Sequence, residues 1–91
     1  PRAWVGVSGV DHPEGVQLER IFENGPAFRA GLQSGDIVTR LNGEPVRSFA
    51  TFMESVSPAR PGEIITLGIK RADLDLEVRL TIERRRGSRS R

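Results

Sequence analysis

The clearest alternation of apolar and polar residues lies near the C-terminal end of the chain. Residues 74–82 alternate strictly, from Leu74 to Ile82, with charged residues and one threonine between the apolar ones. Period-two alternation over such a length is typical of a strand with one buried face and one solvent-facing face. Residues 65–69 alternate in the same way, and the short segment "RAD" joins the two runs. Residues 63–83 therefore predict a β-hairpin.

Two more strands are predicted upstream, in the segments "GVQLERIF" (15–22) and "DIVTRLNG" (36–43). The second segment ends in Asn42-Gly43, a pair that favours tight turns. With the hairpin, and with an early apolar run at 4–7, the chain contains about five or six short strands.

Two helices are also predicted. Ser48 is a good N-cap residue, and the apolar side chains after it fall at helical spacing until Pro58 ends the pattern. These apolar residues are Phe49, Phe52, Met53 and Val56. A shorter helix fits residues 25–32, with Pro26 in its first turn and Gly31 at its end. The fold class is therefore mostly β (α+β).

Length and composition narrow the class of protein. The chain has 91 residues, of which 36% are hydrophobic and 29% charged, and this describes one folded domain rather than a disordered segment. No apolar run approaches membrane-spanning length, so we expect no membrane insertion. The absence of cysteine excludes disulfides and thiolate metal sites. Because the chain starts at Pro1 with no signal segment, we expect a mature product or a piece of a longer protein.

Charge is unevenly distributed along the chain. Residues 84–91 carry five arginines and no acid, which leaves nine basic against twelve acidic residues, a net −3, for residues 1–83. We expect a folded domain over 1–83 and a flexible basic tail over 84–91. Such a tail is usually a solvated end, so we expect no nucleic-acid partner. Nucleic-acid binding by the tail would fall steeply with salt.

No catalytic or metal site is recognisable. The segment around Ser8, "GVSG", lacks the G-x-S-x-G spacing of a nucleophile turn, and His12 is the only histidine that could act as a base. Asp11, His12 and Glu14 do not have the regular spacing of metal ligands. We therefore expect a non-catalytic domain with no cofactor and no metal.

The order of the segments resembles a PDZ domain, specifically the bacterial type found in HtrA-family serine proteases. The segments are "WVGV", "GPAFRAGLQSGDIVTRLNGEPV", "SFATFMESV" and "RPGEIITLGIKR", and the resemblance covers about residues 3–83. It implies a partly open β-sandwich or barrel. Only three residues precede Trp4, whereas animal PDZ domains have a full strand there. The resemblance therefore implies a circular permutation in which residues 74–82 supply that strand.

The resemblance also implies a binding site for the C-terminus of another chain. Gly6 lets successive backbone N–H groups turn toward one point, and such a concavity captures a carboxylate. The peptide would pair with the strand at 7–10 and lie against the helix at 49–56. The expected carboxylate loop is Trp4, Val5, Gly6 and Val7, the pairing strand is Ser8, Gly9 and Val10, and the groove is Phe49, Ala50, Met53 and Val56.

The side chains predict the specificity of this groove. A pocket of Val5, Val7, Met53 and Val56 favours a terminal Val, Leu, Ile, Ala or Phe. Phe49, or Ala50 if the alignment shifts by one residue, stands where many animal PDZ domains have a histidine, so an apolar residue is expected two positions before the peptide end.

Roles are also predicted for four residues outside the groove, and for one of them two roles remain open. Arg2 either adds positive charge near the carboxylate or is an exposed terminal arginine. Trp4 is interpreted as positioning the loop, and Leu41 and Phe52 as core residues.

The predicted function is a peptide-binding module that regulates an HtrA-like serine protease or recognises its substrates. The catalytic domain would then lie upstream in the parent chain, and the compartment would be extracytoplasmic, such as the bacterial periplasm or cell surface. The alternative is a structural adaptor, in which the groove holds a neighbouring domain or subunit instead of a free C-terminus.

Overall fold

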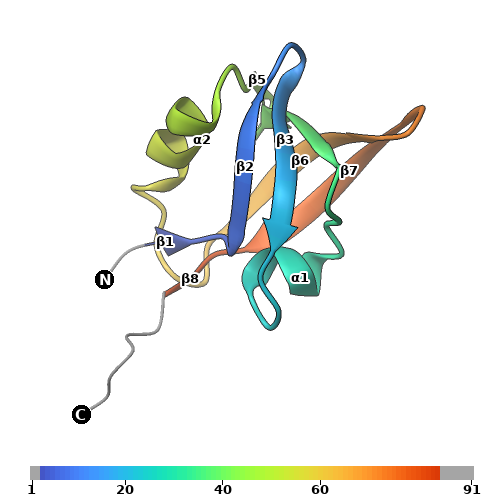
Figure 1. Cartoon of the computed structure of the whole chain (residues 1–91). Coiled ribbons are helices and arrows are strands. Elements are labelled where there is room, and N and C mark those ends of the chain that lie inside the picture. The colour runs from blue at the N-terminus through green and yellow to red at the C-terminus, as the bar shows by residue number, and fades with distance from the viewer. Residues whose placement is uncertain (1–2, 85–91) are drawn as a thin grey trace.

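The computed structural model describes residues 3–84 as one main antiparallel sheet, a small second sheet and two helices. The five long strands pair in the order β2 (Val7–His12), β3 (Gly15–Ile21), β4 (Ile37–Leu41), β6 (Ile64–Arg71) and β7 (Leu74–Thr81). The two-residue strand β5 (Glu44–Pro45) pairs with β4 beside this path. In Figure 1 the β2–β3 hairpin crosses in front of the β6–β7 hairpin, so the sheet curls into the predicted partly open sandwich. The predicted mostly β fold class is confirmed.

The second sheet joins the two ends of the described chain. Strand β1 (Ala3–Trp4) pairs antiparallel with β8 (Glu83–Arg84), with Ala3 opposite Arg84 and Trp4 opposite Glu83. Because β8 continues from β7, the last long strand leads directly to the start of the chain (Figure 1). Residues 85–91 of the predicted basic tail lie outside the described residues, whereas Arg84 belongs to β8.

Both helices form where capping residues predict them. Helix α2 (Phe49–Val56) begins after Ser48, whose Oγ accepts the N–H of Thr51 at 3.1 Å. Helix α1 (Pro26–Ala30) has proline in its first turn and ends at Gly31, whose φ of +89° is the left-handed cap conformation. In Figure 1, α2 and α1 lie at opposite ends of the sheet. No helix within residues 3–84 is long and apolar enough to cross a membrane.

One hydrophobic core is formed by every long strand and both helices. Phe52 from α2, Leu67 from β6 and Leu80 from β7 are among its most buried members. The apolar face of residues 74–82 becomes more buried along the strand, with Leu76 and Val78 partly buried against the core. Leu80 and Ile82 are buried, but Leu74 remains 60% exposed because the β6–β7 turn extends beyond the core (Figure 1).

A partly buried ion pair links Asp36, directly before β4, to Arg71 at the end of β6. Asp36 is 1% exposed, and its carboxylate accepts two hydrogen bonds from the Arg71 guanidinium, at 2.9 and 2.8 Å. The N–H of Gln33 donates a third at 2.9 Å. Burial by itself raises the pKa of the Asp36 carboxyl, but the hydrogen bonds from Arg71 and Gln33 outweigh it, so the pKa lies below its ordinary value of 3.8.

Candidate functional site

The loop at residues 4–7, between β1 and β2, directs two backbone N–H groups toward the open side of the sheet. The carbonyl of Val5 accepts the N–H of Ala27 at 2.9 Å, and the carbonyl of Gly6 accepts the N–H of Phe22 at 2.9 Å. In a trans peptide unit the N–H points away from the preceding carbonyl. The N–H groups of Gly6 and Val7 therefore both point away from α1 and β3. For Val5, the third expected amide, no such bond fixes the direction.

Gly6 is required at this turn. Its φ is +79°, a conformation that side chains disfavour, and a Cβ built on it lies 3.3 Å from Pro26 Cδ. The Trp4 indole packs over the same region, 3.6 Å from that Cβ position, and its ring stacks on Phe22 with 6.4 Å between centroids. These contacts place the indole against the loop, and its role in positioning the loop stays a prediction.

Strand β2 is an edge of the main sheet, and the alternation of its bonds leaves part of its backbone unpaired. The bond from Phe22 to Gly6 makes Val7 and Ile21 a non-hydrogen-bonded pair, so the N–H and C=O of Val7 face away from β3. The N–H and C=O of Gly9 also face away from β3. Leu18, which lies opposite Gly9, donates its N–H to the Asp36 carbonyl and accepts the Gly35 N–H, so neither backbone group of Leu18 bonds to β2. These backbone groups of Val7 and Gly9 pair with no other strand within residues 3–84.

Helix α2 lies beside this edge and approaches it closely at one end. The side chain of Asp11 on β2 accepts the Phe49 N–H at 2.8 Å, which links β2 to the N-terminus of α2. A Cβ built on Gly9 lies 3.4 Å from Phe49 Cδ1 and only 2.8 Å from the Gln17 carbonyl. Glycine is therefore required here by the Gln17 carbonyl, while the Phe49 ring lies at ordinary contact distance. The edge of β2 and the side of α2 border the groove expected for the peptide.

A hollow of about 270 Å³ lies along α2 at the loop end of this groove. It is lined by Ala3, Ala50, Met53, Glu54, Val56 and Ser57. Met53 is half-buried against the core, and Ala50 is exposed. Val5 and Val7, expected to line a pocket here, are 1% and 9% exposed and belong to the core. Of the predicted groove residues, Ala50, Met53 and Val56 line the hollow and Phe49 does not. Val56 is at the same time 1% exposed, so it belongs to the core together with the two valines.

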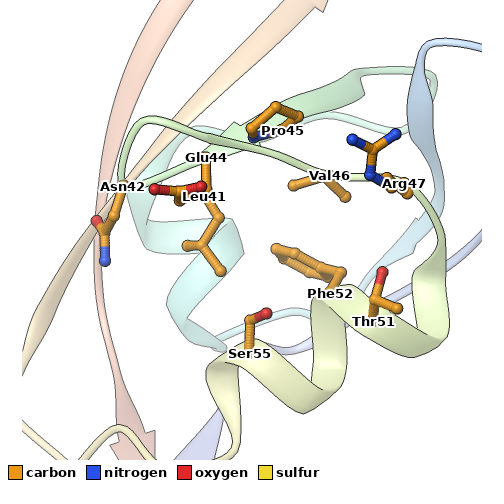
Figure 2. Close-up of a pocket in the computed structure, with 9 residues that line it drawn as sticks. All are labelled: Leu41, Asn42, Glu44, Pro45, Val46, Arg47, Thr51, Phe52 and Ser55. Atoms are coloured by element: carbon orange, nitrogen blue, oxygen red, sulfur yellow. The ribbon is translucent and has the colours of Figure 1, made fainter.

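A larger hollow of about 410 Å³ lies between α2 and residues 41–47. Figure 2 shows Leu41, Val46 and Phe52 forming its apolar floor, with Thr51 and Ser55 from α2 beside them. All three floor residues are buried core members. Leu41 and Phe52 thus have the core positions predicted for them.

Comparison with known proteins decides the family, because residues 3–82 match the PDZ domain family. The chain belongs to the PDZ domain family. This PDZ domain is 33% identical over 76 residues to the serine endoprotease DegS of Salmonella typhimurium, a match that covers 84% of this chain and 21% of DegS. It is 34% identical over 74 residues to the periplasmic serine endoprotease DegP of Escherichia coli, covering 81% of this chain and 16% of DegP.

The fold also matches a solved structure of the HtrA3 PDZ domain bound to a phage-derived ligand, FGRWV. The TM-score is 0.80 at 24% identity, with 89% of this chain and 85% of that chain covered. The protein is thus a PDZ domain resembling those of HtrA-family proteases, a non-catalytic binding module. It spans about a fifth of the length of the curated proteases that it matches.

The sequence missed the residues that brace the site. The N–H groups of Phe22 and Ala27 hold the carbonyls of Gly6 and Val5, and no local sequence pattern predicts that role. The carboxylate of Asp11 accepts the N–H of Phe49 at the start of α2, a role that its spacing to His12 and Glu14 does not indicate. His12 Nδ1 accepts the N–H of Glu14 at 3.0 Å within the β2–β3 turn, and residues 3–84 contain no cluster of metal-ligating side chains. Arg2 lies outside the described residues.

Proposed function

We propose that this PDZ domain binds the free C-terminal segment of a partner polypeptide as an additional strand beside β2. The observation that carries the proposal is the direction of the Gly6 and Val7 N–H groups, fixed by the bonds that hold the carbonyls of Val5 and Gly6. These two donors lie where an antiparallel strand pairing with Val7 and Gly9 would end. A terminal carboxylate is the group that accepts from both.

The expected affinity is moderate. Hydrogen bonds to a charged acceptor contribute about 1.5–3 kcal/mol each, and burial of one apolar side chain contributes about 1.5–3 kcal/mol. Association and ordering of the peptide cost a large part of this sum. We expect a Kd of about 1–100 µM.

The last residue of the peptide is expected to be Val, Leu, Ile, Ala or Phe. Met53 retains accessible apolar surface beside the hollow, and Ala50 and Val56 also line it, while Val5 and Val7 are buried in the adjacent core. The ligand named with the HtrA3 PDZ domain, FGRWV, ends in valine, which supports the same preference here.

The residue two positions before the end would lie opposite Gly9. Directly opposed residues in an antiparallel pair point to the same face, and that face is covered by the Phe49 ring. An apolar side chain is therefore expected at this position as well. We expect Phe49, rather than Ala50, to contact it, because the Phe49 ring is the one that lies beside Gly9.

In the parent protein we propose a regulatory or substrate-recognition role for an HtrA-like serine protease outside the cytoplasm. The similarity to DegS and to the periplasmic DegP supports this role. The competing function is an interdomain adaptor, in which the groove holds a neighbouring folded segment that has no free carboxylate.

Titration with matched peptides separates these functions. A peptide ending in valine with a free carboxylate should shift the NMR amide signals of Gly6, Val7 and Gly9, and its C-terminal amide should bind at least about tenfold more weakly. Equal binding of the acid and the amide, or shifts confined to other strands, would rule out carboxylate capture and favour the adaptor.

A charge placed on α2 tests whether the helix borders the bound peptide. Met53→Glu puts a negative charge beside the expected carboxylate and should abolish detectable binding in calorimetry. Ser55→Glu is the matched control, because Ser55 lines the hollow on the other side of α2 and should leave binding unchanged. Undiminished binding by Met53→Glu would remove α2 from the groove.

A further inference from the structure

Two aromatic rings and one cationic side chain form a row beside the loop proposed to bind the carboxylate: Trp4 from β1, Phe22 directly after β3, and Arg20 from β3. The Trp4 ring stacks on Phe22, and the Arg20 guanidinium carbon lies 5.0 Å from the Phe22 ring centroid. The proposed function makes no use of Arg20. Its side chain is exposed, and it forms no ion pair with another of the residues 3–84.

The register places Arg20 next to the path of a bound strand. Arg20 lies directly opposite Ser8, so both side chains project from the same face of the hairpin. That face is opposite to the one on which neighbouring Val7 enters the core. Because Ser8 is short, no bulky side chain separates Arg20 from the open edge of β2.

A peptide bound in the proposed manner would present its penultimate side chain to Arg20. If the last residue lies opposite Val7 and the third from the end opposite Gly9, the penultimate residue lies opposite Ser8 on the outer face. Its backbone would be two strand spacings, about 10 Å, from that of Arg20. Two long side chains that lean toward each other can span this separation.

We propose that Arg20 gives this domain a preference for an acidic side chain at the penultimate position of its peptide ligands. The inference rests on the proposed function. Contact with the Phe22 ring restrains the guanidinium, so less side-chain freedom is lost when a carboxylate pairs with it. The pair would remain in contact with solvent, and pairs of that kind give about a 1.5- to 5-fold effect on an equilibrium.

The test uses three peptides that end in valine and differ only in a penultimate Glu, Gln or Lys. At low ionic strength the wild-type domain should bind the Glu peptide about 1.5- to 5-fold more tightly than the Gln peptide, and the Lys peptide most weakly. Arg20→Gln should abolish this preference. Arg79→Gln is the control for net charge, because Arg79 is exposed on β7, and it should keep the preference. The difference should shrink in high salt.

Three outcomes would contradict the inference. Equal wild-type binding of the Glu and Gln peptides would overturn the role of Arg20 while leaving carboxylate capture intact. Equal weakening of all three peptides by Arg20→Gln, with an unchanged urea midpoint, would show that Arg20 acts on the terminal carboxylate instead. Failure of every peptide to bind the wild-type domain would refute the proposed function, and this inference with it.

Discussion

Replacing Gly6 with alanine perturbs the loop at residues 4–7, the proposed carboxylate site, while adding a single methyl group. A residue with a side chain pays about 1–2 kcal/mol to adopt a left-handed conformation, and the φ of Gly6 is +79°. The added Cβ also lies 3.3 Å from Pro26 Cδ and 3.4 Å from Gly25 Cα, which forces the loop to shift by a few tenths of an ångström. Both effects act on the peptide units that carry the Gly6 and Val7 N–H groups.

Gly43→Ala is the matched control. Gly43 has a φ of +85°, and nothing lies within 4 Å of a Cβ built on it. It lies in the β4–β5 turn, remote from the loop at residues 4–7. Its substitution therefore carries the same conformational cost without a contact that moves a neighbour.

The two variants should differ in binding more than in stability. Both should lose about 1–2 kcal/mol in urea unfolding followed by Trp4 fluorescence, a loss that a domain of ordinary stability survives. Misalignment that removes one charged hydrogen bond should weaken peptide binding about 10- to 100-fold in Gly6→Ala. Gly43→Ala should bind as the wild type does.

Calorimetric titration of both folded variants with one valine-ended peptide decides the outcome. If Gly6→Ala keeps wild-type affinity, the outward N–H groups of the loop are not the carboxylate site. If it is too unstable to titrate, the ratio of acid to amide binding in the wild type still tests the same N–H groups.

Three other substitutions test the framework around the site. Asp36→Asn should destabilise the domain at neutral pH, because the pKa of the Asp36 carboxyl lies below 3.8 in the folded state. The stability that the ionised carboxylate contributes is complete above pH 3.8. It is lost as the pH falls through the lower folded-state pKa. Urea unfolding at several pH values should show the gap closing in acid, and a constant gap would exclude a role for the charged pair with Arg71. Asp11→Ala should lower the free energy of unfolding by about 1 kcal/mol, since no carboxylate then holds the Phe49 N–H beside β2. It should also speed peptide release in stopped-flow measurements. An unchanged release rate would show that this contact does not set the groove width. Leu80→Ala, at a fully buried site, should cost about 2–5 kcal/mol, and a loss below 1 kcal/mol in the same assay would mean that β7 is not packed as described.

The main strands and helices were predictable because their signals are local. Alternation over residues 74–82 and 65–69 identifies β7 and β6, and Ser48 followed by a helical stripe identifies α2. In each case the pattern is contained within the element that it predicts. The prediction therefore needs no knowledge of what packs against that element.

Pairings between distant segments could not be predicted in the same way. Strands β1 and β8 have two residues each, too few to show a period, and their pairing joins opposite ends of the chain. The alternation also assigns Leu74 and Leu80 to the same face of the strand, yet Leu74 is exposed and Leu80 is buried. A periodic pattern tells which face a side chain is on, but not whether another element covers that face.

The site shows the same division between local and distant information. The "WVGV" segment and its resemblance to PDZ domains pointed to Gly6, whose backbone conformation is a local property. The direction of the N–H groups depends on Phe22 and Ala27, which lie in other elements. Arg20 reaches the outer face beside Ser8 only because β3 pairs with β2 in this register.

The unpaired edge of β2 also affects the solution behaviour of the domain when no ligand is bound. An open edge is a template for pairing with a second molecule, and proteins limit this by local irregularities and by charge. Here the ladder is irregular between Ser8 and Gly9, and Asp11 adds an exposed negative charge farther along the strand. Pairing of two domains through this edge is therefore expected to be strongest when the groove is vacant, and a ligand bound in the proposed manner should reduce it.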